Sequence, residues 1–190
     1  MTTAIFIDGG YIAEITKNLG IRIDFERLRD YVKGKTQLYR TYYYYCMPFQ
    51  SAEPSAEEST RYSKASKFIE RLRQIPDFEV KLGKIQRVYN KEFHKYEFNQ
   101  KMVDVMIAVD IVKLSIEKTI TRAILMAGDS DFVYAIEIAK QYGIDIELYY
   151  YRDHKDHSDN SNYINDDLFN AVTEPKLMNS HFFEKCQMLR

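Results

Sequence analysis

The chain has 190 residues, 45% of them apolar and 29% charged, as expected for a soluble globular protein with one domain. Its net charge of −1 excludes a general electrostatic attraction to nucleic acid or membrane, so any basic surface must be local. No apolar run reaches the roughly 18 residues that a membrane span needs. Cys46 and Cys186 lie far apart without metal-site spacing, which favours free, buried thiols and a cytoplasmic protein.

In the first half of the chain, apolar runs alternate with amphipathic stretches, which predicts alternating strands and helices. The first strand stops at Asp8, and Gly20 is the expected cap of the helix that follows it. A polar stretch at 49–60 contains proline and predicts a surface loop. The expected elements are a strand at 3–7, a helix at 11–19, a helix capped by Asp24, a strand at 38–47, a helix ending towards Pro76, and a strand at 78–88 that forms a hairpin with 93–98.

The second half continues the alternation, and its helix at 100–114 is apolar nearly all round, which indicates a buried helix. A strand at 123–127, a helix at 130–142, a strand at 144–151, a polar stretch at 152–162 and a short helix at 163–172 follow. The expected fold class is therefore α/β, a three-layer α/β/α sandwich with a mainly parallel five-stranded sheet. The domain is expected to cover 1–172, and the tail at 173–190 shows no strong pattern.

Carboxylates recur where apolar segments end or are interrupted. Asp8 follows the first strand, Asp129 and Asp131 follow the strand at 123–127, and Asp104 lies in the apolar helix between them. In a parallel sheet, neighbouring strands bring their carboxyl ends to one edge, where the next helices begin. We therefore expect these carboxylates to meet at that edge.

Each acid also has a structural interpretation. An Asp before two glycines, as at Asp8, is common in turns, and the two acids after Gly128 are typical helix N-caps. Asp104 lies three residues after Lys101 and could form an ion pair with it on a helix. Asp110 lies about 120° from Asp104 around the helix, so we expect it to serve the core or a neighbouring helix.

Gathered carboxylates repel one another and raise one another's pKa values. A Mg²⁺ or Mn²⁺ ion removes this penalty, because both ions prefer oxygen ligands. Such an ion can activate water and neutralise a phosphodiester during in-line attack. The sequence shows no Ser-His-Asp order, pair of nucleophilic thiols or glycine-rich phosphate loop that would indicate a different chemistry.

The same segments resemble the NYN domain family, a PIN-like group of metal-dependent ribonucleases that includes the LabA-like proteins. The resemblance covers roughly residues 3–172. It rests on Ile5-Phe6-Ile7-Asp8-Gly9, on Lys101-Met102-Val103-Asp104-Val105 with Asp110 after it, on Ala127-Gly128-Asp129-Ser130-Asp131-Phe132, and on Asp166-Asp167-Leu168-Phe169.

The resemblance implies a PIN-like, Rossmann-type fold and a ribonuclease, most simply an endonuclease, that uses Mg²⁺ or Mn²⁺ to cleave RNA. By this resemblance Asp8, Asp104 and Asp129 are metal ligands, directly or through water, and Asp131 is the fourth catalytic acid. PIN-like sites are often built in dimers, so a homodimer is also implied. The residues expected to contact the substrate are Ser130, Gly9, Tyr11 and Lys101.

One departure from the family follows the first acid. Many members carry Asn shortly after Asp-Gly, where this chain has Gly10-Tyr11, so a polar group that could touch the substrate or metal is missing. This favours an alternative, a catalytically weak or inactive module that binds RNA or a protein partner and regulates it. A phosphohydrolase for small esters is a third hypothesis, although its usual Asp-x-Asp is absent after strand one.

Other features have both a functional and an ordinary explanation. The segment 91–98 alternates aromatic and charged residues, as does a strand lining a nucleic-acid groove or any solvent-facing edge strand. His154 and His157 have a spacing that could bind a metal ion, but a solvated loop explains them as well. Basic residues that could form a local patch are Lys64, Lys67, Arg71, Arg73, Lys81, Lys84 and Arg87.

Overall fold

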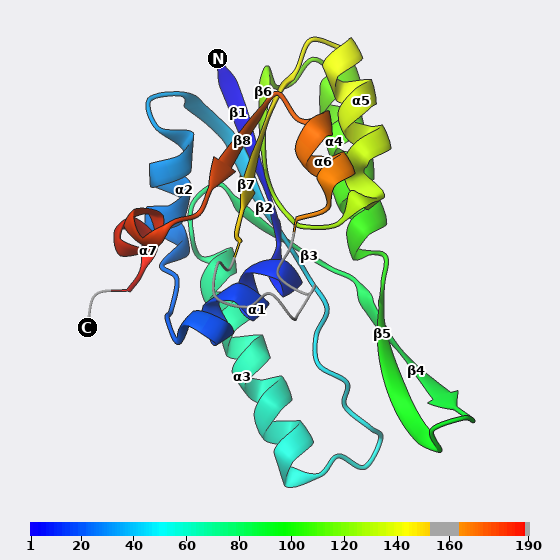
Figure 1. Cartoon of the computed structure of the whole chain (residues 1–190). Helices are drawn as coiled ribbons and strands as arrows, with labels where there is room; N and C mark the ends of the chain where they lie inside the picture. Colours follow the sequence, from blue (N-terminus) through cyan, green and yellow to red (C-terminus); the bar gives the residue numbers. More distant parts are fainter. Residues whose placement is uncertain (153–163, 189–190) are drawn as a thin grey trace.

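β1 (Thr2–Asp8) lies inside a six-stranded parallel sheet (Figure 1). Its residues Ala4 to Ile7 have no exposed surface, because side chains on both faces of the strand are covered by helices. Continuous apolar runs of this kind are typical of parallel strands buried on both faces. The computed structural model describes residues 1–152 and 164–188.

The strand order places the two most apolar strands side by side, since β1 pairs in parallel with β6. In spatial order the strands are β3 (Phe78–Leu82), β2 (Gln37–Tyr45), β1, β6 (Arg122–Met126), β7 (Asp145–Tyr150) and β8 (Glu174–Leu177). From β1 the chain adds β2 and β3 on one side, and it then returns to the other side of β1 to add β6, β7 and β8. The carboxyl ends of β1 and β6 are therefore a topological switch point.

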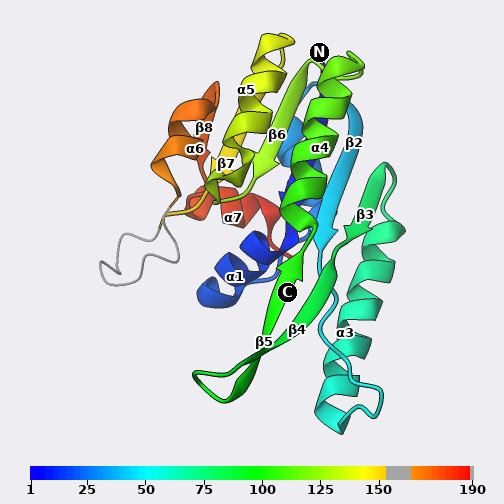
Figure 2. The same ribbon diagram turned by 90° about the vertical axis from the view of Figure 1, so that its right-hand side faces the viewer.

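Helices cover both faces of the sheet, which confirms the expected three-layer α/β/α sandwich (Figures 1 and 2). One face packs against α4 (Val103–Ile116), α5 (Val133–Gln141) and α6 (Asp166–Ala171). The other face packs against α1 (Gly9–Leu19), α2 (Phe25–Lys33), α3 (Ala56–Arg73) and α7 (Ser180–Cys186).

Local signals in the sequence set several helix ends as expected. Gly20 caps α1 in the left-handed conformation, with φ of 65°. The Asp24 side chain accepts hydrogen bonds from the N–H groups of Glu26 and Arg27 at the start of α2. Both cysteines are free and buried, as predicted. Within the described residues, no helix combines the length and apolar character that crossing a bilayer would require.

The expected single strand at 78–88 is wrong, because Gly83 divides it into β3 and β4 (Lys84–Asn90). The Gly83 N–H still donates to the Tyr45 carbonyl at the edge of the main sheet, and then the chain turns away. β4 forms an antiparallel hairpin with β5 (Lys95–Lys101), which extends the predicted pairing. Consequently α4 begins at Val103, not at residue 100.

Three further expectations are corrected. The α4 helix is not buried all round: Val105 and Val109 are 65% and 56% exposed, because apolar character alone does not determine whether a neighbour covers a helix face. The sheet has six strands and not the expected five. The additional strand is β8, in the tail for which no element was expected. The predicted helix at 130–142 begins with a single turn of 3-10 helix, η1 (Ser130–Phe132). Residues 153–163, including His154 and His157, lie outside the described residues.

Candidate active site

Asp8 occupies the last position of β1 and caps the first turn of α1. Its Oδ1 accepts hydrogen bonds from the backbone N–H of Gly10 at 2.8 Å and of Tyr11 at 3.2 Å. The extended strand and the glycines that follow allow the chain to turn directly into the helix. The structural interpretation of Asp8 as a cap is therefore correct, and it leaves the second carboxylate oxygen outside these two bonds.

Asp129 lies beyond the end of β6, the strand beside β1. The register pairs Ile7 with Met126, so both chains leave the sheet at the same edge. The Asp129 side chain accepts hydrogen bonds from the N–H of Asp131 at 3.3 Å and from the hydroxyl of Ser130 at 3.4 Å. It thus caps η1, while Asp131 is exposed to solvent beside it.

Asp104 lies in the first turn of α4, half-buried, at the same edge. The proposed ion pair with Lys101 does not form, because Lys101 belongs to β5 and is exposed instead of lying one turn earlier on the helix. Met102, between the strand and the helix, has a φ of 79°, which is uncommon for a residue with a side chain. The backbone therefore turns sharply just before Asp104.

Neighbouring carboxylates act electrostatically on Asp8 and on Asp104. Burial raises the pKa of Asp8 to about 6, and the charges of Asp104 and Asp129 add to the rise, although the N–H groups of Tyr11 and Gly10 oppose it. Burial also raises the pKa of Asp104, and Asp129 and Asp131 raise it further. In the described part of the chain, no Lys or Arg forms an ion pair with any of the three.

These carboxylates lie at the N-termini of α1, α4 and η1, where helix dipoles favour negative charge. Among the described residues, no three His, Cys, Asp or Glu side chains lie close enough to enclose a metal ion by themselves. Mg²⁺ does not need such a cage, because it usually keeps several waters and binds one or two carboxylates together with substrate phosphates. The donor set is all oxygen and lacks a neutralising cation, so its chemistry fits a hydrated Mg²⁺ or Mn²⁺ ion.

Asp110 belongs to a different cluster, although it lies on the same helix as Asp104. Its Oδ2 accepts hydrogen bonds from the Tyr44 hydroxyl and from Lys81 Nζ, both at 2.7 Å. These partners come from β2 and β3, so Asp110 links α4 to the sheet. Asp110 was expected to serve the core or a neighbouring helix; its partners are instead two strands of the sheet, and neither belongs to the acidic site.

The residues expected to contact substrate are placed as follows. Gly9 is buried against Tyr43, and a Cβ built on it would lie 2.6 Å from Tyr43 Cζ. Tyr11 packs against Gly128, and its hydroxyl accepts a hydrogen bond from the Tyr151 N–H at 2.8 Å. These two residues therefore support the site from within. Ser130 donates a hydrogen bond to Asp129, and Lys101 is exposed at the end of β5.

Gln100 was not anticipated as a site residue. A Cβ built on Gly10 would lie 3.2 Å from Asp8 Oδ1 and 3.8 Å from both polar atoms of the Gln100 side chain. This amide therefore lies beside the first acid. The alternation of Tyr96, Phe98 and Gln100 places the three residues on one face of a strand. The predicted strand did not extend to Gln100, because a helix was expected to begin at residue 100.

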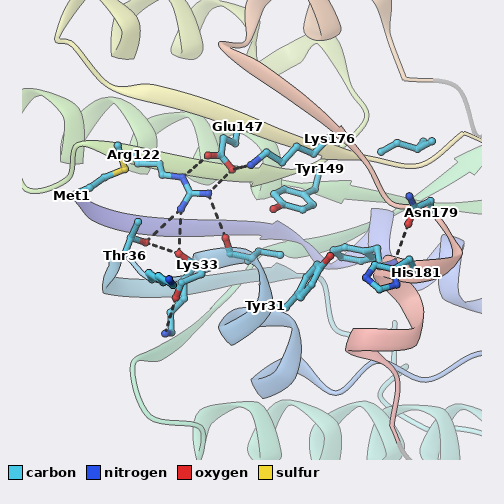
Figure 3. A pocket seen from close by; sticks show the side chains of 15 residues that line it. Met1, Tyr31, Lys33, Thr36, Arg122, Glu147, Tyr149, Lys176, Asn179 and His181 are labelled. Carbon is cyan, nitrogen blue, oxygen red and sulfur yellow. Dashed lines mark hydrogen bonds and ion pairs between the residues drawn. The ribbon is translucent and has the colours of Figure 1, made fainter.

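A pocket of about 680 Å³ lies elsewhere, on the face covered by α2 and α7 (Figure 3). Arg122, Glu147 and Lys176 line it, and both cations pair with the one carboxylate: Arg122 Nε donates to Glu147 at 2.6 Å, and Lys176 Nζ lies 2.8 Å from it. None of the acids of the candidate site lines this pocket. It is therefore separate from the carboxylate edge.

Comparison with known proteins adds independent information. A family model, the NYN domain, matches residues 2–172. An uncharacterized protein of Sinorhizobium fredii is 35% identical over 77 residues, which are 40% of this chain and 32% of that protein, so the chain matches about a third of that relative's length. A crystal structure of a protein of unknown function from Vibrio parahaemolyticus has 18% sequence identity and a TM-score of 0.64 and covers 98% of this chain and 96% of its own. The structural likeness shows a shared fold.

Proposed function

Because this chain belongs to the NYN domain family, a group of PIN-like nucleases, we propose that it is a metal-dependent ribonuclease that hydrolyses RNA phosphodiester bonds. Asp8, Asp104 and Asp129 would hold the hydrated metal ion, directly or through its waters, and Asp131 would act beside them. The observation that carries the proposal is that three carboxylates lie at the N-termini of three helices at one sheet edge, where neighbouring acids raise the pKa values of Asp8 and Asp104. No cationic side chain is paired to the three in the described residues.

Each residue has a defined part in this proposal. Asp8 uses Oδ1 for the two backbone N–H groups, so Oδ2 is available to a metal ion or its bound water. The N–H of Asp131 orients the carboxylate of Asp129. When bound, Mg²⁺ or Mn²⁺ would supply a water of lowered pKa and neutralise charge on the phosphodiester.

A second candidate function is an RNA-binding module with weak or no catalysis. It is favoured by the position after Gly9, where Gly10 has no side chain and the Tyr11 hydroxyl accepts a bond from the Tyr151 backbone. The polar group that many family members present at this point is therefore missing. In this case RNA would bind, with or without metal, and would not be cut.

The two functions are separated by incubating labelled single-stranded RNA with the purified protein in Mg²⁺, Mn²⁺ or EDTA. Asp104→Asn and Asp110→Asn form a matched pair, since both remove one charge from α4 and only the first touches the acidic site. Thermal unfolding with and without Mn²⁺ is measured on the same samples, because a metal that binds the native state raises its stability.

We expect metal-dependent cleavage that falls by about a hundredfold or more in Asp104→Asn and is kept in Asp110→Asn. The Mn²⁺-dependent rise in melting temperature should also be lost in Asp104→Asn alone. Retained cleavage by both Asp104→Asn and Asp129→Asn would refute the proposed site. Absence of cleavage by the wild type on several RNAs, with RNA still bound, would establish the second function.

A further inference from the structure

The hairpin of β4, β5 and their connection, residues 84–101, forms an arm that leaves the body of the protein. Figures 1 and 2 both show it extending beyond the sheet at the end where α1 begins. Its strands pair with each other and not with the main sheet. A two-stranded hairpin is marginally stable by itself, so its position depends on how its base is held.

The base of the arm is anchored tightly to the end of β2. Cys46 Sγ donates to the carbonyl of Lys84 at 3.5 Å and lies 4.0 Å from the carbonyl of Lys101, so it contacts both strands. Gly83 permits this approach, because a Cβ built on it would lie 2.6 Å from the Lys101 carbonyl and 2.8 Å from Cys46 Sγ. The arm therefore projects in a defined direction from the edge that carries the acids.

One face of the arm is aromatic although it is open to solvent. The register places Arg87 opposite Phe98 and Tyr89 opposite Tyr96, and alternate residues of paired strands share a face. The rings of Tyr89 and Tyr96 contact each other edge-on, with their centres 5.1 Å apart. The Arg87 guanidinium lies 3.5 Å from the centre of the Tyr96 ring. Tyr89, Tyr96 and Phe98 nevertheless keep 46%, 51% and 47% of their surface exposed.

The arm is also basic within a chain of net charge −1. Residues 84–101 contain five Lys or Arg and two Glu. Phe49, in the loop after β2, packs against Phe98 with tilted rings whose centres lie 4.9 Å apart, and it extends the aromatic face. Exposed rings interleaved with positive charge suit a partner that has flat faces and a polyanionic backbone.

The aromatic face leads to the acidic site. Along β5, Tyr96, Phe98 and Gln100 occupy alternate positions, about 6.8 Å apart on an antiparallel strand. Gln100 ends this row beside Gly10 and Asp8, and α4 with Asp104 begins shortly after β5. A chain lying along the row would reach the carboxylates at its inner end.

We propose that the arm is a binding site for single-stranded RNA, whose bases stack on Tyr89, Tyr96 and Phe98 and whose backbone continues towards Asp8. Single-stranded RNA is the ligand that fits, because its bases are free to stack on side chains, whereas those of a duplex are stacked on one another. Arg87 lies on the same face and would contact its phosphates, and the lysines of the arm add positive charge nearby. The inference rests on the proposed ribonuclease function for the direction of the chain, but the binding itself does not require cleavage.

The test measures binding without turnover, in the full-length Asp129→Asn protein with EDTA present. Fluorescence anisotropy with labelled oligouridine gives the affinity for a single strand, and a labelled RNA duplex of equal length gives the comparison. Tyr89→Ala/Tyr96→Ala removes two rings, and Tyr89→Phe/Tyr96→Phe keeps them. Val88→Ala is the control on the opposite face of the arm, since Val88 pairs with Glu97.

We expect the alanine pair to weaken oligouridine binding by about ten- to a hundredfold, and the phenylalanine pair and Val88→Ala to stay within about threefold of the parent. The duplex should bind less tightly than the single strand. Circular dichroism melting checks that each variant is folded. Arg87→Gln, on the aromatic face opposite Phe98, gives a second measurement, with a smaller dependence of affinity on salt.

Equal oligouridine affinity for the alanine pair and the parent overturns the inference, as does preference for the duplex or absence of RNA binding. The outcome for cleavage is independent. If the wild type fails to cut RNA while the ring substitutions weaken binding, the arm inference holds and the ribonuclease proposal fails. If cleavage is metal-dependent and the alanine pair binds and cuts RNA like the wild type, the ribonuclease proposal holds and the arm inference fails.

Discussion

The ring of Tyr43 lies against the α-carbon of Gly9, so that a Cβ atom there would be 2.6 Å from Tyr43 Cζ and 2.7 Å from the carbonyl oxygen of Tyr44. The second contact is with backbone and cannot be relieved by rotating a side chain. Gly9 therefore allows α1 to begin directly beside β2, which fixes the direction of the Asp8 carboxylate. The family-like Asp-Gly pair is in this sense a packing requirement of the site.

Substituting Gly9 by alanine should consequently destabilise the fold and misplace Asp8. Overpacking a buried position costs about 1–3 kcal/mol, which lowers the melting temperature by several degrees in a chain of this size. Urea unfolding and the cleavage assay measure the two effects. Gly10→Ala is the matched control for stability. The three atoms nearest its Cβ belong to side chains, Asp8 Oδ1 at 3.2 Å and the Gln100 amide at 3.8 Å, and alanine favours the helix, so its stability should stay close to that of the wild type.

The position of Asp8 was predictable because its determinants are local. An apolar run of strand length, followed by an acid and glycines, specifies a strand end and a helix start, and the parallel-sheet rule then brings β1 and β6 together. The partners of Asp110 were not predictable in this way. Tyr44 and Lys81 lie 66 and 29 residues away in the chain, and no local pattern shows that their side chains meet under α4.

The arm and the last strand were missed for a related reason. Residues 78–88 read as one strand, since nothing in their composition reveals that Gly83 must pass between Cys46 and Lys101. β8 is short and contains Glu174 and Lys176, so it lacks the apolar run that marked the inner strands. Edge strands exposed on one side have weak hydrophobic patterns, and their pairing depends on the sheet already being formed.

Asp8 should destabilise the native state at neutral pH in the absence of metal. Its pKa is raised from 3.8 to about 6, so between these values the folded protein binds more protons than the unfolded chain and stability falls as pH rises. Above about pH 6 the penalty is fully present. Asp8→Asn keeps an N-cap and removes the charge, so we expect it to be more stable than the wild type by about 1–3 kcal/mol near pH 8 in EDTA.

The same comparison of Asp8→Asn with the wild type at acidic pH serves as the control. Near pH 4 the Asp8 carboxyl is largely protonated in the folded protein, and the variant and the wild type should unfold at nearly the same urea concentration. Addition of Mg²⁺ at about pH 8 should stabilise the wild type more than Asp8→Asn. An Asp8→Asn protein that is equally stable or less stable than the wild type in EDTA at both pH values would contradict a repulsive carboxylate cluster.

Glu147 should show the opposite dependence, because its charge is compensated. Burial by itself raises the pKa of Glu147, but the hydrogen bonds and charges of Arg122 and Lys176 outweigh burial and lower it below 4.5 (Figure 3). The unfolded chain therefore binds more protons at acidic pH, and the stabilisation is present above about pH 4.5 and is lost as pH falls through the folded-state pKa.

Glu147→Gln leaves the buried Arg122 charge without its carboxylate, which costs about 3 kcal/mol at neutral pH. Urea unfolding as a function of pH should show that this loss of stability shrinks below about pH 4. The control is Glu174→Gln, because the exposed Glu174 carboxylate lies 3.5 Å from the same Lys176 Nζ. This substitution should change stability by less than about 1 kcal/mol at every pH. A loss in Glu147→Gln that does not depend on pH would mean that packing, and not the charge of Glu147, stabilises this face of the sheet.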